Sequence, residues 1–579
     1  VIVGTVQSGM PEHTHQTCTE VKLPAFTLEN PQLWSCEFPQ LYNAEVVVTA
    51  DGMVVDSLTE QFGIRSLEFS PEFGFKLNGK KIFLQGNANH HDLGALGAAS
   101  YDRAIERMML QLKSFGYNCI RCSHNPYSES FARIADRVGM LVVNELTDKW
   151  SDNDYWGGRQ PFTHLWHKLI TEWIKRDRNR PSIILWSLGN ELQIREGWAG
   201  FEGTNDWGIT TYNIFNQLVK RWDHTRLTTV AMFPARAGAI TRHDKEFNDY
   251  LVPPELACAT EVASFNYQSD KYDAYLKYQP DLILFQSEAE TSKLLQPYYN
   301  MDRKRTVGMA YWGSAEYWGE SNKWPKKGWN YSFFDHTMRP YPQAYLIKSA
   351  FMPEIPEVHI GVVDAAGAES VSWNDVTVGR MALNECWNHI PGSRQSLFTY
   401  TNAHSVELLV NGQSMGVQQN DTTQANLRNM IYWKDVPYGN GGSVVAIARD
   451  KSGKEVARHR IETAGKAVAL QIETETPADW KADGMDLQYI NVTAIDKKGR
   501  PVWDYNEPLT LQMEGAARLV ALDNGDHYTD ELFQGITSKR MYQGRMQIIL
   551  RSTKTPSNVK LKISSADLKE KLSLKTFLK

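Results

Sequence analysis

Two glutamates stand out because each follows a short apolar run in the middle of the chain. Glu191 comes soon after Ile183-Ile184-Leu185-Trp186, and Glu288 comes soon after Leu282-Ile283-Leu284-Phe285. Two carboxyl groups can cleave a glycosidic bond when one donates a proton to the leaving oxygen and the other attacks the anomeric carbon. Their surroundings must keep the first group protonated and the second ionised. The pattern predicts that Glu191 and Glu288 form such a pair.

Polar and aromatic residues follow most of the other apolar runs in this region, and we expect eight of them to contact the substrate. Arg121 could hold the attacking carboxylate ionised, and Tyr267 could hydrogen-bond it. Glu145, after the third run, has the plainer interpretation of a salt-bridge partner. The eight predicted substrate-binding residues are His90, Asp92, Arg121, His124, Asn190, Tyr267, Trp312 and Glu316.

The elements that must position these residues alternate in type between residues 67 and 352. A helical pattern runs over 104–113, and Ser128 can cap a second helix that ends at Gly139. We predict eight strands, at 82–84, 119–121, 141–143, 183–186, 227–230, 262–265, 282–285 and 307–310. Eight strands with intervening helices indicate a (β/α)₈ TIM barrel, whose active site lies at the carboxyl ends of the strands.

Hairpin patterns flank this barrel on both sides. Strands separated by turn residues occur around Asp51-Gly52, around 450–454 and around 496–500. Three such units predict immunoglobulin-like β-sandwich modules around the barrel. The predicted domains are 1–66 (a partial sandwich), 67–352 (the barrel), 353–465 and 466–579 (two further sandwiches).

Composition narrows the classes of partner. The net charge of −5 gives no basic footprint, which argues against nucleic acid. The 18 tryptophans suit sugar binding, although aromatic rings are also ordinary core material. No run of 18 apolar residues is present, so we expect no membrane span. Cys119 and Cys122 have the spacing of a metal or redox pair, but a buried structural role is the better interpretation because no second pair exists.

The run Ser182-Ile183-Ile184-Leu185-Trp186-Ser187-Leu188-Gly189-Asn190-Glu191 resembles the acid/base signature of glycoside hydrolase family 2. The stretches 62–65, 75–80, 121–126 and 319–321 resemble other motifs of that family, and the resemblance covers residues 25–350 most strongly. A weaker likeness at 406–412 is similar to an accessory sandwich of Bacteroides-type members. The family contains β-galactosidases, β-glucuronidases and β-mannosidases.

The resemblance implies double displacement with retention of configuration. Glu191 would be the acid/base, with Asn190 on the sugar's 2-hydroxyl. Glu288 would be the nucleophile, with Glu290 as its competitor. His90, His124 and Trp312 match positions that line the glycone subsite.

Several departures from the family pattern qualify this expectation. The N-terminal jelly-roll domain is missing, which places the activity of the chain alone in doubt. The stretch Asp148-Lys149-Trp150-Ser151 lacks the ligands that hold magnesium in some members, so we expect no metal and no cofactor. Glu316 stands where an Asp is usual, and Asn330-Tyr331-Ser332 lacks the Lys that reads a uronate. A neutral glycone is therefore favoured.

The sequence thus predicts a retaining exo-β-glycosidase that removes a terminal β-linked sugar from an oligo- or polysaccharide. Galactose is the favoured identity of that sugar. The alternatives are a β-glucuronidase or another member activity, a non-catalytic carbohydrate-binding protein, and a scaffold built from the sandwiches. The resemblance and the sandwich modules favour a periplasmic or secreted location. No oligomeric state is predicted.

Overall fold

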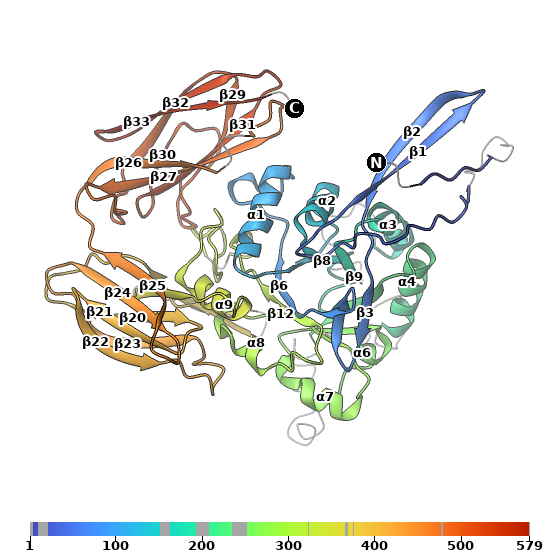
Figure 1. Ribbon diagram of the computed structural model, residues 1–579, viewed down its shortest axis with the longest axis horizontal. Coiled ribbons are helices and arrows are strands. Elements are labelled where there is room, and N and C mark those ends of the chain that lie inside the picture. The colour runs from blue at the N-terminus through green and yellow to red at the C-terminus, as the bar shows by residue number, and fades with distance from the viewer. Residues whose placement is uncertain are drawn as a thin grey trace.

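The structure is a computed structural model of the 579-residue chain. It describes residues 4–9, 21–150, 162–192, 208–233, 252–321, 323–364, 369–373, 376–475 and 479–577. A barrel occupies the centre, and two β-sandwiches stand on one side of it (Figure 1).

Eight parallel strands close into the barrel, in the order β10-β11-β12-β13-β6-β7-β8-β9. They are β6 (Leu84–Asn89), β7 (Cys119–Cys122), β8 (Leu141–Glu145), β9 (Ile183–Ser187), β10 (Leu227–Met232), β11 (Val262–Asn266), β12 (Leu284–Ala289) and β13 (Gly308–Trp312). The predicted fold class is confirmed. Two strands were predicted two residues too early, because apolar runs marked 82–84 and 282–285 whereas β6 and β12 extend into polar residues.

Helices surround the strands and carry the signals that the sequence predicted. In α2 (Glu129–Val138), the Ser128 hydroxyl accepts a hydrogen bond from the Phe131 amide, and Gly139 ends the helix in the left-handed conformation. The helix α1 (Asp102–Ser114) ends just before Gly116, whose φ is 86°. The other described α-helices are α3 (Phe162–Asp177), α4 (Ile209–Trp222), α6 (Glu255–Ala259), α7 (Tyr272–Tyr278), α8 (Gln296–Asn300) and α9 (Pro342–Phe351).

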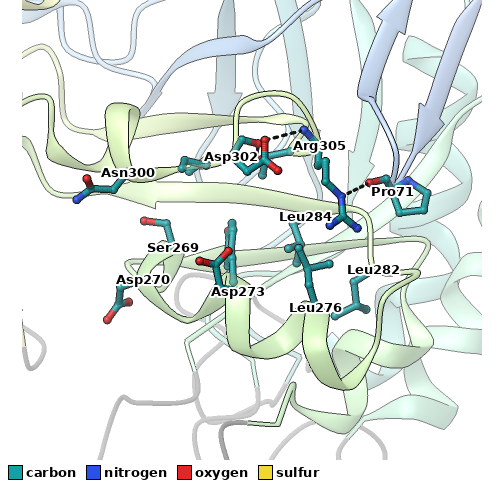
Figure 2. Close-up of a pocket in the computed structure, with 13 residues that line it drawn as sticks. Pro71, Ser269, Asp270, Asp273, Leu276, Leu282, Leu284, Asn300, Asp302 and Arg305 are labelled. Atoms are coloured by element: carbon teal, nitrogen blue, oxygen red, sulfur yellow. Dashed lines mark hydrogen bonds between the residues drawn. The ribbon is translucent and has the colours of Figure 1, made fainter. Parts of the chain in front are cut away.

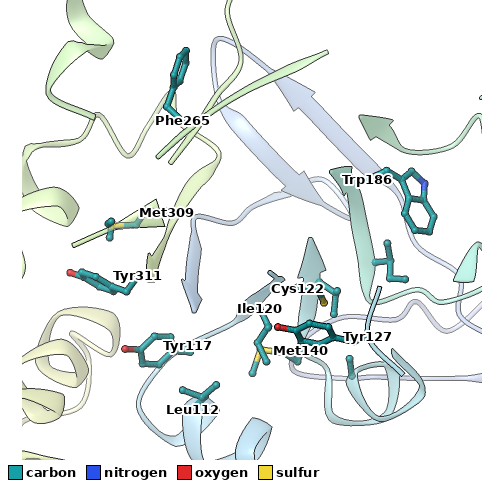
Figure 3. Close-up of a cluster of buried hydrophobic side chains, with 14 of the residues drawn as sticks. Leu112, Tyr117, Ile120, Cys122, Tyr127, Met140, Trp186, Phe265, Met309 and Tyr311 are labelled. Atoms are coloured by element: carbon teal, nitrogen blue, oxygen red, sulfur yellow. The ribbon is translucent and has the colours of Figure 1, made fainter. Parts of the chain in front are cut away.

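The barrel has two hydrophobic layers, because alternate residues of each strand face opposite sides. Ile120 and Cys122 point outward with Tyr117 and Tyr311 into the layer beneath the helices (Figure 3). Cys119 belongs instead to the inner layer. Both cysteines are free and buried, as a structural role predicts.

Each of the two sandwiches consists of two four-stranded antiparallel sheets around its own core. The first has the sheets β19-β16-β20-β23 and β22-β21-β24-β25. Its strands are β16 (Val358–Val363), β19 (Leu383–Asn384), β20 (Arg394–Thr401), β21 (Ser405–Val410), β22 (Gln413–Gln419), β23 (Met430–Pro437), β24 (Ser443–Arg449) and β25 (Glu455–Glu462).

The C-terminal sandwich has the sheets β26-β27-β31-β29 and β30-β28-β32-β33. Its strands are β26 (Ala467–Thr474), β27 (Leu487–Asp496), β28 (Pro508–Glu514), β29 (Ala517–Asp523), β30 (Ser538–Arg540), β31 (Arg545–Ser552), β32 (Asn558–Ser565) and β33 (Leu568–Lys575). Because β16 begins at Val358 and β26 at Ala467, we propose to keep the domain boundaries at 352/353 and 465/466.

The N-terminal stretch contributes one long hairpin, β1 (Tyr42–Ala50) with β2 (Met53–Phe62), which projects from the barrel (Figure 1). Its apolar side chains are open to solvent, with Met53 69% and Val54 64% exposed. Five short strands form two small sheets: β3 (Leu67–Ser70) with β4 (Gly74–Leu77) and β5 (Lys80–Lys81), and β14 (Tyr317–Trp318) with β15 (Gly328–Trp329). A further pair is β17 (Glu369–Trp373) with β18 (Val376–Arg380).

Candidate active site

Arg121, at the carboxyl end of β7, is the centre of a buried polar cluster inside the barrel mouth. Its side chain has no exposed surface. One terminal nitrogen, Nη1, donates to Glu288 Oε1 at 2.7 Å, and the other, Nη2, donates to Glu145 Oε2 at 2.7 Å and to Asn190 Oδ1 at 2.9 Å. Burial alone would lower the pKa of Arg121, but the charges of Glu145 and Glu288 outweigh burial and raise that pKa above its usual range.

The Glu288 carboxylate is held at both oxygens. Arg121 binds Oε1, and the Tyr267 hydroxyl donates to Oε2 at 2.6 Å. Burial, and next the neighbouring Glu288 charge, raise the pKa of Tyr267 well above its usual value, so the phenol stays a proton donor. These two contacts fix the orientation of the Glu288 carboxylate, as an attacking carboxylate requires.

Glu145 is a fully buried salt-bridge partner, as the plainer interpretation of the sequence had it. Besides Arg121, its carboxylate meets His124 Nδ1 at 2.6 Å and accepts from the Ser187 hydroxyl at 2.6 Å. Glu145 therefore shares Arg121 with Glu288 and fixes the ring of His124. It acts behind the cleft and positions groups that can meet a substrate.

Asn190 and Glu191 follow β9 on the same rim. The Asn190 amide donates to Asp148 Oδ1 at 3.0 Å and lies 3.2 Å from His124 Nε2. Glu191 is 6% exposed and has a positive φ of 47°; Tyr267 shares this backbone feature, with φ of 59°. Two residues thus adopt a costly backbone conformation at the barrel mouth: Tyr267, which contacts the Glu288 carboxylate, and Glu191, which follows β9.

Lys149 supplies a positive charge in the stretch 148–151, where some members of the family resembled hold magnesium. Its ammonium lies 2.6 Å from Asp148 Oδ1 and 3.9 Å from Glu191 Oε2. Burial raises the pKa of Asp148, but the His124 and Lys149 charges outweigh it and lower that pKa to about 2. A cation of the protein therefore already neutralises the carboxylates on this side.

Aromatic rings form one wall of the cluster. The rings of His124 and Trp312 are stacked, 5.3 Å apart with a 4° angle between their planes. His90 packs edge-on against Trp312 at 5.1 Å and against Tyr317 at 4.9 Å. Flat apolar faces with polar edges are suited to the face of a sugar ring.

Two predicted site residues do not join this cluster. Asp92 accepts backbone hydrogen bonds from Gly94 at 2.9 Å and Trp318 at 3.2 Å, so it shapes the loop after β6. Burial raises the pKa of Asp92 to about 6. Glu316 is 1% exposed at its side chain and points toward His336 and Tyr341 instead.

Three residues of the cluster were missed as site residues, although they also lie at or near strand ends. Glu320 lies 3.8 Å from His90 Nε2 and hydrogen-bonds the Tyr317 hydroxyl. Asn266 donates to Asn190 Oδ1 at 3.0 Å. Lys149 is the third. The position after each strand was the available signal for Asn266, but no sequence signal shows where the Glu320 loop folds back.

Glu290, the competitor for the nucleophile's role, has a different partner. Its carboxylate lies 2.6 Å from Lys293 Nζ, and it begins the short 3₁₀ turn Thr291–Lys293. The contacts to Arg121 and Tyr267 belong to Glu288 alone among these two residues. The geometry therefore favours the predicted register.

A separate cavity of about 180 Å³ lies beside α7 (Figure 2). Asp270, Asp273 and Leu284 are among its lining residues, and Arg305 donates to the Pro71 carbonyl at 3.1 Å at its edge. No residue of the Arg121 cluster lines it. Within the described residues, no helix is long and apolar enough to cross a membrane.

Comparison with known proteins gives three matches to models of glycoside hydrolase family 2. The family's TIM-barrel domain matches residues 72–307, its C-terminal domain 5 matches 470–572, and a further family-2 model matches 3–65. A domain of unknown function matches 392–457. The three family-2 matches together span well over half of the chain.

Individual relatives agree with this result. The beta-galactosidase BoGH2A of Bacteroides ovatus is 27% identical over 94% of this chain and 67% of its own length. A Formosa agariphila protein provisionally named a beta-glucuronidase is 26% identical over 94% of this chain and 53% of its own. This chain thus spans about half to two thirds of the length of these two relatives.

A solved structure has the same architecture. The structure of a glycosyl hydrolase family 2 member from Bacteroides cellulosilyticus superposes with a TM-score of 0.84 at 28% identity, covering 96% of this chain and 72% of that one. Since the barrel, the C-terminal sandwich and the N-terminal stretch all match one family, the chain belongs to glycoside hydrolase family 2.

Proposed function

We propose that this glycosidase is a retaining exo-β-glycosidase that removes a terminal β-linked galactose from an oligo- or polysaccharide. The observation that carries the proposal is the Glu288 carboxylate, bound by Arg121 at 2.7 Å and by Tyr267 at 2.6 Å in the barrel mouth. A carboxylate immobilised at that place is suited to attack an anomeric carbon.

In the first step, Glu288 displaces the leaving oxygen and forms a covalent glycosyl-enzyme, while Glu191 donates a proton to that oxygen. In the second step, Glu191 takes a proton from water, and the water releases the sugar from Glu288. In this second step the Lys149 ammonium, 3.9 Å from Glu191 Oε2, faces the carboxylate that has given up its proton.

Sugar recognition falls to groups that converge on the same mouth. Asn190 would bind the 2-hydroxyl, held in place by Arg121 and Asn266. His90, His124 and Trp312 would line the glycone subsite. Hydrogen bonds to the 2-hydroxyl strengthen in the transition state, so fixing Asn190 from two sides contributes to the rate.

The second candidate is a β-glucuronidase, which the similarity to the Formosa agariphila protein favours. Such an enzyme needs a cation for the uronate carboxylate. Asn330, in the stretch that lacks the Lys, donates to the Tyr528 hydroxyl at 3.3 Å and makes no hydrogen bond to the Arg121 cluster among the described residues. The neutral glycone is therefore preferred.

A matched pair of substrates tests the proposal. The chain is assayed with 4-nitrophenyl β-galactoside and β-glucuronide, and the first-formed anomer is followed by proton NMR. We expect β-galactoside turnover with β-galactose formed first. A preference for the glucuronide would select the alternative, first-formed α-anomer would refute retention, and binding of galactosides without turnover would indicate a carbohydrate-binding protein.

The proposal also includes a periplasmic or secreted location. Fractionation of the source cells, with an antibody against the chain, tests this part. Recovery in the cytoplasmic fraction would refute it.

A further inference from the structure

A second cluster of ligand-type side chains lies where the barrel meets the C-terminal sandwich. Glu316 and His336 come from the segment after β13, and His527 comes from the loop after β29. All three residues are buried, and one potential ligand atom of each lies within 4.8 Å of the others. None of them contacts the Arg121 cluster in the hydrogen bonds described above.

The spacing of these atoms fits a common metal. Glu316 Oε2 lies 3.2 Å from His336 Nδ1 and 3.1 Å from His527 Nε2. Ligands about 2.0–2.1 Å from a tetrahedral zinc ion are separated from one another by about 3.3–3.4 Å. The two measured separations are close to this edge length, so little movement would be needed.

His527 gives an independent sign that something is bound here. Its side chain is only 3% exposed, and neither of its ring nitrogens makes a hydrogen bond within the described residues. The approach to Glu316 Oε2 is short, yet it lacks hydrogen-bond geometry. A buried imidazole whose ring nitrogens make no well-formed hydrogen bond is costly, and a metal on Nε2 would satisfy that nitrogen.

The outer contacts resemble those that support metal-binding histidines. His336 Nε2 lies 2.8 Å from Asp523 Oδ1, and a carboxylate on the far nitrogen orients the ring and makes the near nitrogen a better ligand. The other oxygen of Glu316 accepts from the Tyr341 hydroxyl at 2.8 Å and lies 3.5 Å from Arg380. Oε2, which also accepts a hydrogen bond from the His336 backbone amide at 3.2 Å, is the oxygen that faces both imidazole rings.

Space and access are also present. A cavity of about 20 Å³ beside Glu316, His336 and Asp523 has room for about one water molecule. A larger cavity of about 160 Å³ is lined by Glu316 and His527 and offers an entry path.

A comparable trio in the first sandwich lacks this geometry. The rings of His359 and His459 are stacked 4.0 Å apart with 24° between their planes, beside Glu385. Because these rings are nearly parallel and 4.0 Å apart, their planes meet beyond metal-binding distance of the ring nitrogens, and one ion cannot lie in both planes. The rings of His336 and His527 are instead tilted by 54°, and their planes intersect.

We propose that Glu316, His336 and His527 bind one Zn²⁺, which ties the loop after β13 to the C-terminal sandwich. Two imidazoles and a carboxylate form a ligand set that zinc prefers. Binding releases to solvent any proton that His336 Nδ1 carries, because the ion takes that lone pair. The site is independent of the proposed glycosidase function.

Zinc content tests the site directly. The full chain is dialysed against a buffer of fixed free Zn²⁺, and bound zinc is measured by plasma mass spectrometry. We expect about one zinc per chain, loss of it in His527→Gln, and retention in the matched control His459→Gln. Zinc below about one fifth of an equivalent in the wild type, or equal zinc in both variants, would overturn the proposal.

A second measurement needs no variant. Co²⁺ in place of Zn²⁺ should give the intense visible absorption of a four-coordinate site in the wild-type chain, and Zn²⁺ should abolish it at one equivalent. The thermal midpoint should also rise with Zn²⁺ concentration, since an ion that binds only the folded chain stabilises it. A featureless cobalt spectrum would refute the site even if His527→Gln failed to fold.

Discussion

Replacing Tyr267 by Phe removes one of the two groups that hold the Glu288 carboxylate. The Tyr267 hydroxyl donates to Glu288 Oε2 at 2.6 Å, and this hydrogen bond is partly buried and charge-assisted. Such a bond contributes about 1.5–3 kcal/mol. If it is lost from the transition state, kcat/KM should fall by about 10- to 150-fold, since 1.36 kcal/mol corresponds to a factor of ten.

The assay for Tyr267→Phe measures kcat/KM with an aryl β-galactoside, with near-UV circular dichroism to verify the fold. Tyr272 offers a matched control, because its hydroxyl is buried and has no hydrogen-bond partner within the described residues. Tyr272→Phe should therefore keep wild-type activity. A fall of less than about threefold in Tyr267→Phe, or an equal fall in both variants, would refute the role assigned to this contact.

Four further predictions follow from the same geometry. Glu288→Gln should abolish turnover and prevent labelling by a 2-fluoro glycoside, whereas Glu290→Gln should keep turnover; peptide mapping that finds the label on Glu290 would reverse the assignment. Glu191→Ala should lose acid catalysis and recover part of its rate with azide and a good leaving group, and unchanged activity without azide would exclude Glu191 as the acid. Arg121→Met should lower the free energy of unfolding by about 3–5 kcal/mol, because two buried carboxylates lose their partner; an unchanged urea midpoint would contradict this. Burial raises the pKa of Asp92 to about 6, so the folded chain binds a proton at Asp92 more tightly than the unfolded chain does. The stabilisation is therefore fully present below about pH 4 and is lost as pH rises through 6. Asp92→Asn should flatten the pH dependence of the free energy of unfolding, measured by urea titrations at several pH values, and an unaltered pH dependence would exclude Asp92 as its source.

The barrel could be predicted from the sequence because the signals for its strands and helices lie within short stretches of neighbouring residues. Apolar runs, the Ser128 cap and the Gly139 stop each depend on neighbouring residues, and the structure confirms the cap and the stop. Polar residues at the strand ends were predictable for the same reason. Parallel strands bring their carboxyl ends together, so Arg121 and Glu288 meet although 167 residues separate them.

The destinations of long loops could not be predicted in this way. Glu316 was expected at the substrate because it follows the eighth strand, but its contacts are with His336 and with His527 of a different domain. No pattern near Glu316 in the sequence indicates that the C-terminal sandwich covers it. How two domains dock depends on the shapes of surfaces that distant segments form together. A local pattern of apolar residues does not predict those surfaces.

The positive φ angles of Glu191 and Tyr267 set fold stability against activity at these two positions. A non-glycine residue in the left-handed conformation costs about 1–2 kcal/mol, and glycine relieves that cost. Substitution by glycine would thus lower the energetic cost of the positive φ angle, but the substitution would also remove the side chain that the chemistry needs. Selection for stability alone would favour replacement of both residues by glycine. Their retention among related sequences would therefore indicate selection for turnover.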